Sequence, residues 1–267
     1  MKAAGYCYVF GMGMQKAMAY RADFFLSIVS CIFPIIMQVY LWTALYAAGA
    51  ADTNGYTYEQ MILYTLLAGI TARIVATGFE NDVAQDIKDG GLNKYLVKPV
   101  DYGGYYFAQF LGGKAGPIAF LLAVTAAVLA GAAAVLGAAF SPLRLGLYAL
   151  SLAGAAVLNF VLFYAIALLG FWLTEIRQLF GTIAIVILVA SGGVFPLDIF
   201  GPAGRWMAAV LPFGYTTQFC VNIVTGRLAP GQIALGFAAQ WLWAGAFAAL
   251  CAVLWRQGAK RYTAVGG

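Results

Sequence analysis

The feature that most constrains this chain is a series of long apolar stretches that carry almost no charge. A bilayer core of about 30 Å needs about 20 helical residues. Stretches near or above this length occupy residues 24–48, 60–78, 115–140, 145–174 and 233–255, and a shorter one fills 179–193. At 63% hydrophobic and 9% charged residues, the chain has more apolar surface than a water-soluble domain can bury. The sequence predicts an all-α polytopic membrane protein that forms one domain over residues 1–267.

The placement of Lys and Arg predicts the topology. With six crossings and the amino terminus inside, eleven of the 15 basic residues are cytoplasmic and only Arg144, Arg205 and Arg227 lie outside, as the positive-inside rule requires. A further crossing over residues 205–225 would place the basic tail outside. That run also contains Pro212 and Gly214, so residues 194–230 are expected to form a re-entrant outer hairpin. We expect a multi-pass protein of the cell membrane with both termini cytoplasmic.

The first 23 residues have the composition of a helix that lies in the cytoplasmic membrane interface. Tyr6, Tyr8 and Phe10 are suited to the headgroup level, and Lys16 and Arg21 to anionic lipid. The following apolar stretch is too long for a cleavable signal, so it is expected to stay as an anchor. The basic pI near 9.0 is attributed to orientation and lipid contact, and no nucleic-acid partner is expected.

Residues 79–101, here called the elbow, form a charged segment between the second and third apolar stretches. Phe79, Val83 and Ile87 recur every four residues, which predicts an amphipathic helix. The Gly90–Gly91 pair is expected to end this helix, before a second short turn that Pro99 closes.

Small and aromatic residues between the fifth and sixth expected crossings raise two interpretations. One is an outer gate that seals a path and flexes at its glycines; the other is a packed cap over a short fifth helix. The candidate gate residues are Ser191, Gly192, Gly193, Phe195, Pro196, Trp206, Pro212 and Phe213.

A few polar residues fall within the apolar stretches. They are expected either to line a substrate path or to form hydrogen bonds between helices, which is the commoner role of such residues. The candidates for the substrate path are Gln38, Asn159, Tyr164 and Gln240. An apolar interior suits a hydrophobic or amphipathic substrate.

Several chemistries lack the residues that they need. The chain has no histidine and no Cys-x-x-Cys pair, so no metal site is expected. The string Gly112–Gly113–Lys114 lacks the first glycine and the Ser or Thr of a phosphate-binding loop. Glu175 and Asp198 fall on opposite faces in the predicted topology, which disfavours a carboxylate pair for hydrolysis. Arg73 is the one charge placed within an expected crossing.

Two segments resemble the permeases of ABC-2 type transporters, in the branch long catalogued as an uncharacterised domain. The elbow is similar in its QDIKDGGLNKYLVKPVD string, and the hairpin in ASGGVFPLDIFGPAGRWMAAVLPFGYTTQFCVNIVTGR. A departure from the family pattern is the Gly201–Pro202–Ala203 insertion. In the elbow the pattern falls on Ile87, Gly90, Leu92, Leu96, Lys98 and Pro99; in the hairpin it falls on Ser191, Gly192, Pro196, Leu197, Trp206, Leu211, Pro212, Phe213 and Gly226.

The resemblance implies the membrane half of an exporter. Such permeases pair with a second copy or a sister permease, and each elbow sits in a cleft of a cytoplasmic ATPase dimer that binds ATP and Mg²⁺; this chain itself would bind no cofactor. The apolar face of the elbow is then expected to dock on the ATPase. The coupling residues would be Phe79, Val83, Asp86, Ile87, Lys88, Gly90, Gly91, Leu92, Leu96, Lys98 and Pro99. Two alternatives stay open: an ion-coupled carrier or channel that needs no ATPase, and an intramembrane enzyme that acts on lipid.

Overall fold

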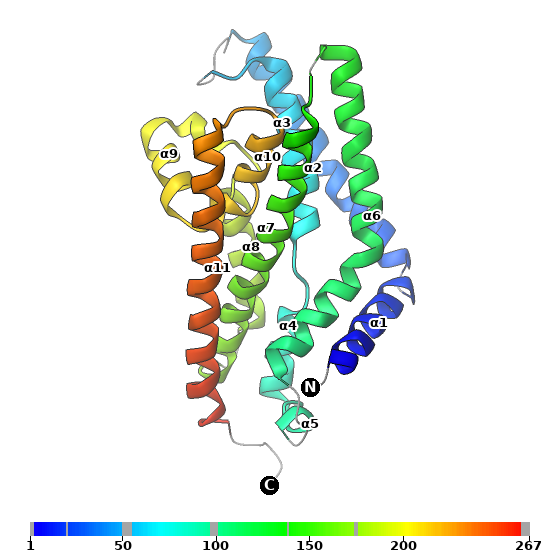
Figure 1. Cartoon of the computed structure of the whole chain (residues 1–267), viewed down its shortest axis with the longest axis vertical. Helices are drawn as coiled ribbons and strands as arrows, with labels where there is room; N and C mark the ends of the chain where they lie inside the picture. Colours follow the sequence, from blue (N-terminus) through cyan, green and yellow to red (C-terminus); the bar gives the residue numbers. More distant parts are fainter. Residues whose placement is uncertain are drawn as a thin grey trace.

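The computed structural model describes residues 3–19, 21–49, 55–96, 101–137, 139–173 and 176–262. Within these ranges the regular structure is helical, with no strand, and the predicted all-α class is confirmed. The long helices run roughly along one axis (Figure 1). The elements are α1 (Ala3–Ala19), α2 (Arg21–Ala47), α3 (Tyr58–Val75), α4 (Glu80–Lys88), α5 (Asn93–Leu96), α6 (Tyr102–Leu136), α7 (Pro142–Leu168), η1 (Leu169–Phe171), α8 (Arg177–Ala190), η2 (Leu197–Phe200), α9 (Gly201–Val210), η3 (Phe213–Tyr215), α10 (Gln218–Val224) and α11 (Pro230–Ala259).

Helix starts follow local signals in the sequence. Thr57 and Gln60 form a capping box at the start of α3, with reciprocal bonds of 3.4 and 3.3 Å between side chain and backbone N–H. Asp101 caps α6 by accepting a hydrogen bond from the Gly104 N–H at 2.6 Å. Pro142 and Pro230 occupy first-turn positions of α7 and α11, where a missing N–H costs nothing.

Four segments of the described chain are long and apolar enough to cross a membrane: Tyr58–Lys88, Tyr102–Val135, Pro142–Phe171 and Pro230–Ala259. The first takes in both α3 and α4, although the helix is interrupted between Val75 and Glu80. Ile32–Ala47 in α2 and Gln178–Ala190 in α8 are apolar but shorter. The count of six crossings therefore stays a prediction.

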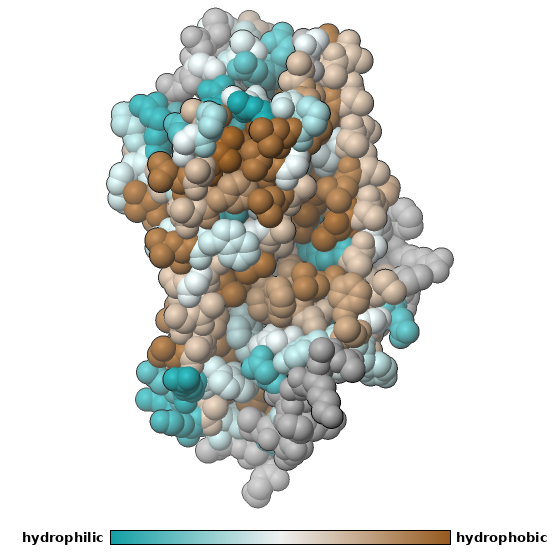
Figure 2. Space-filling model, viewed as in Figure 1, coloured by the Kyte–Doolittle hydropathy of each residue, from teal (hydrophilic) through white to brown (hydrophobic). Residues whose placement is uncertain are grey.

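The surface has the pattern expected of a membrane protein. Figure 2 shows hydrophobic residues over the middle of one face and hydrophilic residues gathered towards its two ends. On α11 the side chains of Leu235 and Leu242 are 72% and 74% exposed, and on α8 Ile185 is 65% exposed. Apolar side chains this open to the surroundings are stable in lipid and unfavourable in water.

One end of the bundle carries α4 and α5, together with α1 and the end of α11 (Figure 1); it is here called the elbow end. The opposite, far end carries the α6–α7 and α10–α11 links and the short helices of the hairpin region, η2 to α10. The described parts of α1 and α11 thus approach the same end of the molecule. This arrangement is the one that an even number of crossings produces.

The amino-terminal helix α1 packs closely along the elbow-end half of α6 (Figure 1). The contact depends on glycine: a Cβ on Gly112 would lie 2.0 Å from the carbonyl oxygen of Phe10, and one on Gly13 would lie 2.5 Å from that of Gln109. Gly112 therefore allows the backbones of α1 and α6 to approach closely, as small residues commonly do between membrane helices. The prediction of an amino-terminal helix is confirmed for Ala3–Ala19, and its place in the membrane interface stays a prediction.

Candidate functional site

The elbow consists of α4, a glycine turn and α5, as its sequence predicts. Gly90 has a φ of +78°, in the left-handed region that favours glycine. A Cβ on Gly91 would lie 2.5 Å from Oδ1 of Asp86, so this position also needs glycine. The predicted helix break is confirmed. The side chain of Leu96 and all of Lys98 and Pro99 lie outside the described residues.

Asp86 holds the two parts of the elbow together. Its carboxylate is buried, with the residue 9% exposed, and accepts hydrogen bonds from Lys94 Nζ at 3.0 Å, Tyr106 Oη at 2.7 Å and Tyr102 Oη at 3.2 Å. The Asp86 backbone oxygen also accepts the N–H of Leu92 at 2.9 Å. One carboxylate on α4 thereby fixes α5 and the first turns of α6. The cluster of tyrosines at positions 95, 102, 105 and 106 was the sequence signal that could have predicted hydrogen-bond donors for this carboxylate.

The apolar stripe of the elbow faces the chain's own core, which corrects the expectation that it docks on a partner. Val83 and Leu92 are 0% exposed, Ile87 is 6% exposed and Phe79 is 7% exposed. The Phe79 ring lies 4.6 Å from that of Phe160 on α7, between ring centroids. Helix α4 also packs against η1 and α8. The predicted amphipathic helix is present, but its buried face is occupied, because α7 and α8 supply the apolar surface that it needs.

The outward face of the elbow is polar. Its exposed residues are Asn81, Asp82, Gln85, Lys88, Asp89, Asn93 and Lys94. Asp82 forms an ion pair with Lys16 of α1, with 3.5 Å between Nζ and Oδ2. Any soluble partner that reaches the elbow from outside the bundle meets this surface and not the apolar stripe.

The break between α3 and α4 is fixed by side chains from two other helices. Lys114 of α6 donates to the backbone oxygens of Arg73 and Ile74, at 3.1 and 2.7 Å, and Asn159 of α7 donates to that of Val75 at 2.8 Å. These carbonyls belong to the last turn of α3, where no helical partner is available. Arg73 is half-buried and lines a pocket of about 530 Å³ with Lys16 and Lys114. The elbow is thus connected to α6 and α7 as well as to α3.

The candidate gate residues form part of a hydrogen-bonded cap at the far end. The Gly192 carbonyl oxygen accepts from Tyr64 Oη of α3 at 2.7 Å, and the Ser191 carbonyl oxygen accepts from the Gln218 N–H at 3.0 Å. Gly192 has a φ of +77° and, like Ser191, Gly193, Pro196 and Pro212, is buried. A buried turn with satisfied carbonyls favours the packed-cap interpretation.

Aromatic residues of the hairpin lie in different surroundings. Phe195 and Phe213 are both half-buried, and Phe195 packs edge-on against Trp42 of α2, with ring centroids 5.9 Å apart. Trp206 on α9 is 60% exposed, so it seals nothing within this chain. Whether the hairpin re-enters a membrane stays a prediction.

Three of the four candidate path residues are buried. Gln240 of α11 is 0% exposed and donates to the carbonyls of Ser151 and Tyr215 at 3.1 and 2.9 Å. Tyr164 stacks on Phe160, with ring centroids 5.8 Å apart. Asn159, besides its bond to Val75, lines a pocket of about 190 Å³, and Gln38 is half-buried. For Asn159 and Gln240 the structure shows the interhelical hydrogen bonds that were the alternative to a substrate path.

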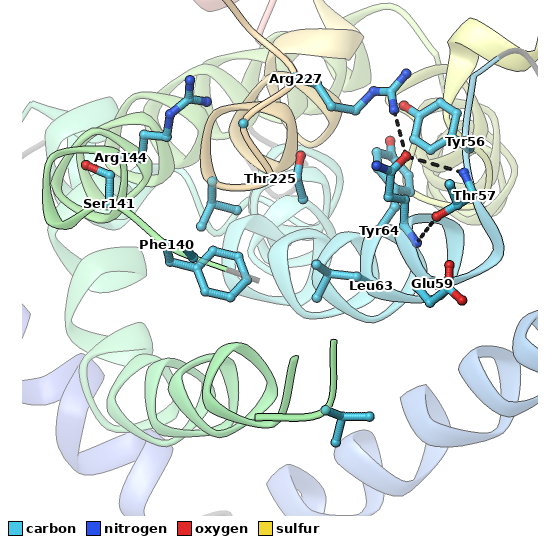
Figure 3. Close-up of a pocket in the computed structure, with 15 residues that line it drawn as sticks. Tyr56, Thr57, Glu59, Leu63, Tyr64, Phe140, Ser141, Arg144, Thr225 and Arg227 are labelled. Carbon is cyan, nitrogen blue, oxygen red and sulfur yellow. Dashed lines mark hydrogen bonds between the residues drawn. The ribbon is translucent and has the colours of Figure 1, made fainter. Parts of the chain in front are cut away.

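A pocket with a volume of about 750 Å³ lies at the far end (Figure 3). The start of α3, the α6–α7 link and the α10–α11 link line it. Arg144 and Arg227, two of the three basic residues expected outside, both reach this pocket. Sequence reasoning did not predict that they line one pocket, because Arg144 lies in the first turn of α7 and Arg227 lies 83 positions later, in the α10–α11 link.

The described residues hold no group of three or more His, Cys, Asp or Glu side chains that could bind a metal ion. The structure is that of a helical membrane protein whose polar elbow, fixed to α6 and α7, lies at one end, with a pocket at the other end. The family model described as ABC-2 family transporter protein matches residues 32–266, and the chain therefore belongs to this family. No match was found among curated proteins or among solved structures.

Proposed function

We propose that this chain is the membrane subunit of an ATP-binding cassette exporter. The observation that carries the proposal is the family match over residues 32–266, since members of this family are membrane transport subunits and not themselves catalytic. In this proposal the chain crosses the cell membrane six times, and both termini and the elbow face the cytoplasm. The excess of Lys and Arg at the termini and elbow supports that orientation.

The energy would come from a separate ATPase dimer that binds ATP and Mg²⁺ and contacts the elbow. The family normally works with such a partner. We propose that the contact uses the exposed polar face of α4 and the glycine turn, because the apolar face is buried against α7 and α8. Since Asp86, Lys114 and Asn159 connect the elbow and the end of α3 to α6 and α7, a displacement of the elbow would move those helices as well.

A complete transporter would contain two membrane subunits, either two copies of this chain or this chain with a sister permease. Exposed apolar side chains on α8 and α11 are compatible with contact to lipid or to a second subunit. The substrate class proposed is hydrophobic or amphipathic.

The proposal is tested by charge reversal on the exposed face of the elbow. Asp89 is exposed and caps the carboxyl end of α4, where a cation is favourable, so Asp89→Lys changes the surface charge without weakening the helix. Arg205→Glu also reverses the charge of an exposed residue, at the far end of the molecule, and serves as the control. A cytoplasmic ABC ATPase co-expressed with this chain should co-purify with the wild type and with Arg205→Glu, and less with Asp89→Lys. Equal recovery with all three would reject the proposed contact.

A further inference from the structure

The far-end pocket contains two arginines that the fold of this chain holds in place without neutralising them. Arg144 Nη1 donates to the carbonyl oxygen of Ile223 at 3.3 Å, at the end of α10. Arg227 Nη1 donates to that of Gly55 at 3.1 Å, and its guanidinium lies 3.6 Å from the centroid of the Tyr56 ring. Within the described residues neither arginine forms an ion pair with Asp or Glu. Both cations therefore keep their charge and further donor groups.

The rest of the pocket is mixed in character. Figure 3 shows Arg144 and Arg227 along one side, with Phe140 and Leu63 across the space from them. Val135 and Val224 add further apolar lining. Among the described residues that line the pocket, Glu59 is the one acidic residue, and it is exposed. A volume of about 750 Å³ is within the range that accommodates a ligand of drug size.

The pocket lies at one end of the helices that are suited to crossing a membrane, which in the proposed topology is close to the lipid headgroups. It lies where α3 and α7 begin and α6 ends, and these helices provide three of the segments suited to crossing a membrane. At such a level a ligand can place a charged group in a polar region and a tail beside apolar side chains. Few basic residues are expected on this side of the chain, yet two of them line one pocket.

We propose that this pocket binds an anionic amphiphile, with a phosphate or carboxylate headgroup attracted by the two arginines, Arg144 and Arg227, that line one side and an aliphatic tail against Phe140 and Leu63. Guanidinium groups bind both kinds of oxyanion through paired hydrogen bonds. The proposal concerns binding alone and does not require that the chain transport the bound molecule. It therefore stands or falls separately from the exporter proposal.

The test compares binding of short-chain phosphatidylglycerol and short-chain phosphatidylcholine, with the same acyl chains, to the purified full-length chain in a neutral detergent. The variants are Arg144→Gln and Arg227→Gln, which remove the charge and keep an amide donor for the backbone carbonyl. Arg205→Gln is the matched control, because Arg205 is exposed on α9 and does not line the pocket. Circular dichroism checks that each variant keeps its helix content.

Wild-type protein should bind phosphatidylglycerol more tightly than phosphatidylcholine, and each pocket variant should weaken phosphatidylglycerol binding about tenfold. Arg205→Gln should leave phosphatidylglycerol binding unchanged. The charge-conserving variants Arg144→Lys and Arg227→Lys should still bind phosphatidylglycerol more tightly than phosphatidylcholine, and they test the proposal even if a Gln variant fails to fold. Equal binding of the two lipids, or an equal loss in Arg205→Gln, would overturn the proposal. If inorganic phosphate alone bound as tightly as the lipid, the predicted role of the tail would be wrong.

Discussion

The carboxylate of Asp86 offers a quantitative test of how the elbow is held. Asp86→Ala would remove the acceptor for Tyr106 and Tyr102 at 2.7 and 3.2 Å and for Lys94 at 3.0 Å. Hydrogen bonds to a buried charge contribute about 1.5–3 kcal/mol each, and the longer tyrosine contact is expected near the lower limit. The lysine is half exposed, so its pair adds at most about 1 kcal/mol. The expected loss of stability is about 3–5 kcal/mol.

A second aspartate on the same helix provides the comparison. Asp82 pairs with Lys16 at 3.5 Å, and both side chains are about half exposed, at 48% and 59%. Its replacement by alanine should cost about 1 kcal/mol or less, including the loss of a favourable charge in the first turn of α4. The free energy of unfolding of both variants can be measured by titrating SDS into mixed micelles. Equal effects of the two substitutions would refute the argument that burial makes Asp86 the fixing point of the elbow.

Two further predictions concern close packing and buried polar groups. Gly112→Ala should displace α1 from α6, because a Cβ there meets the Phe10 carbonyl at 2.0 Å, whereas Gly116→Ala on the same helix meets nothing within 4 Å; limited proteolysis at α1 should increase in the first variant only. Gln240→Leu should lower the free energy of unfolding by about 1–3 kcal/mol in the same SDS titration, since it leaves the buried Tyr215 carbonyl without its donor and removes a second donor from the Ser151 carbonyl. Unchanged stability would show that other donors satisfy those carbonyls.

The sequence predicts the long helices well, because a continuous apolar run has few alternatives to a buried or lipid-facing helix. Expected residues 24–48 correspond to α2, and 233–255 to α11, with small differences at the ends. The apolar stretch expected over residues 115–140 begins well inside α6, because the helix itself begins at Tyr102. Hydropathy reports the apolar portion of a helix and not its extension beyond that portion, where the Asp101 cap was the available signal.

The elbow shows where pattern reasoning stops. The period of Phe79, Val83 and Ile87 predicts the helix and its apolar face, but not which surface covers that face. Here α7 and α8 cover the apolar face, so the face of the elbow that a partner can reach is the polar one and not the expected apolar one. The sequence also could not predict that Arg144 and Arg227 line one pocket, because the position of α7 next to the α10–α11 link depends on how the helices pack.

The central claim is that movement of a substrate by this chain is driven from outside, through the elbow. The most direct test is transport in liposomes of a panel of fluorescent hydrophobic and amphipathic molecules by the purified chain, with and without an ABC ATPase partner, ATP and Mg²⁺. The account predicts transport only when all of these are present, and its loss in Asp89→Lys. Transport by the chain alone, driven by a proton or sodium gradient, would contradict it.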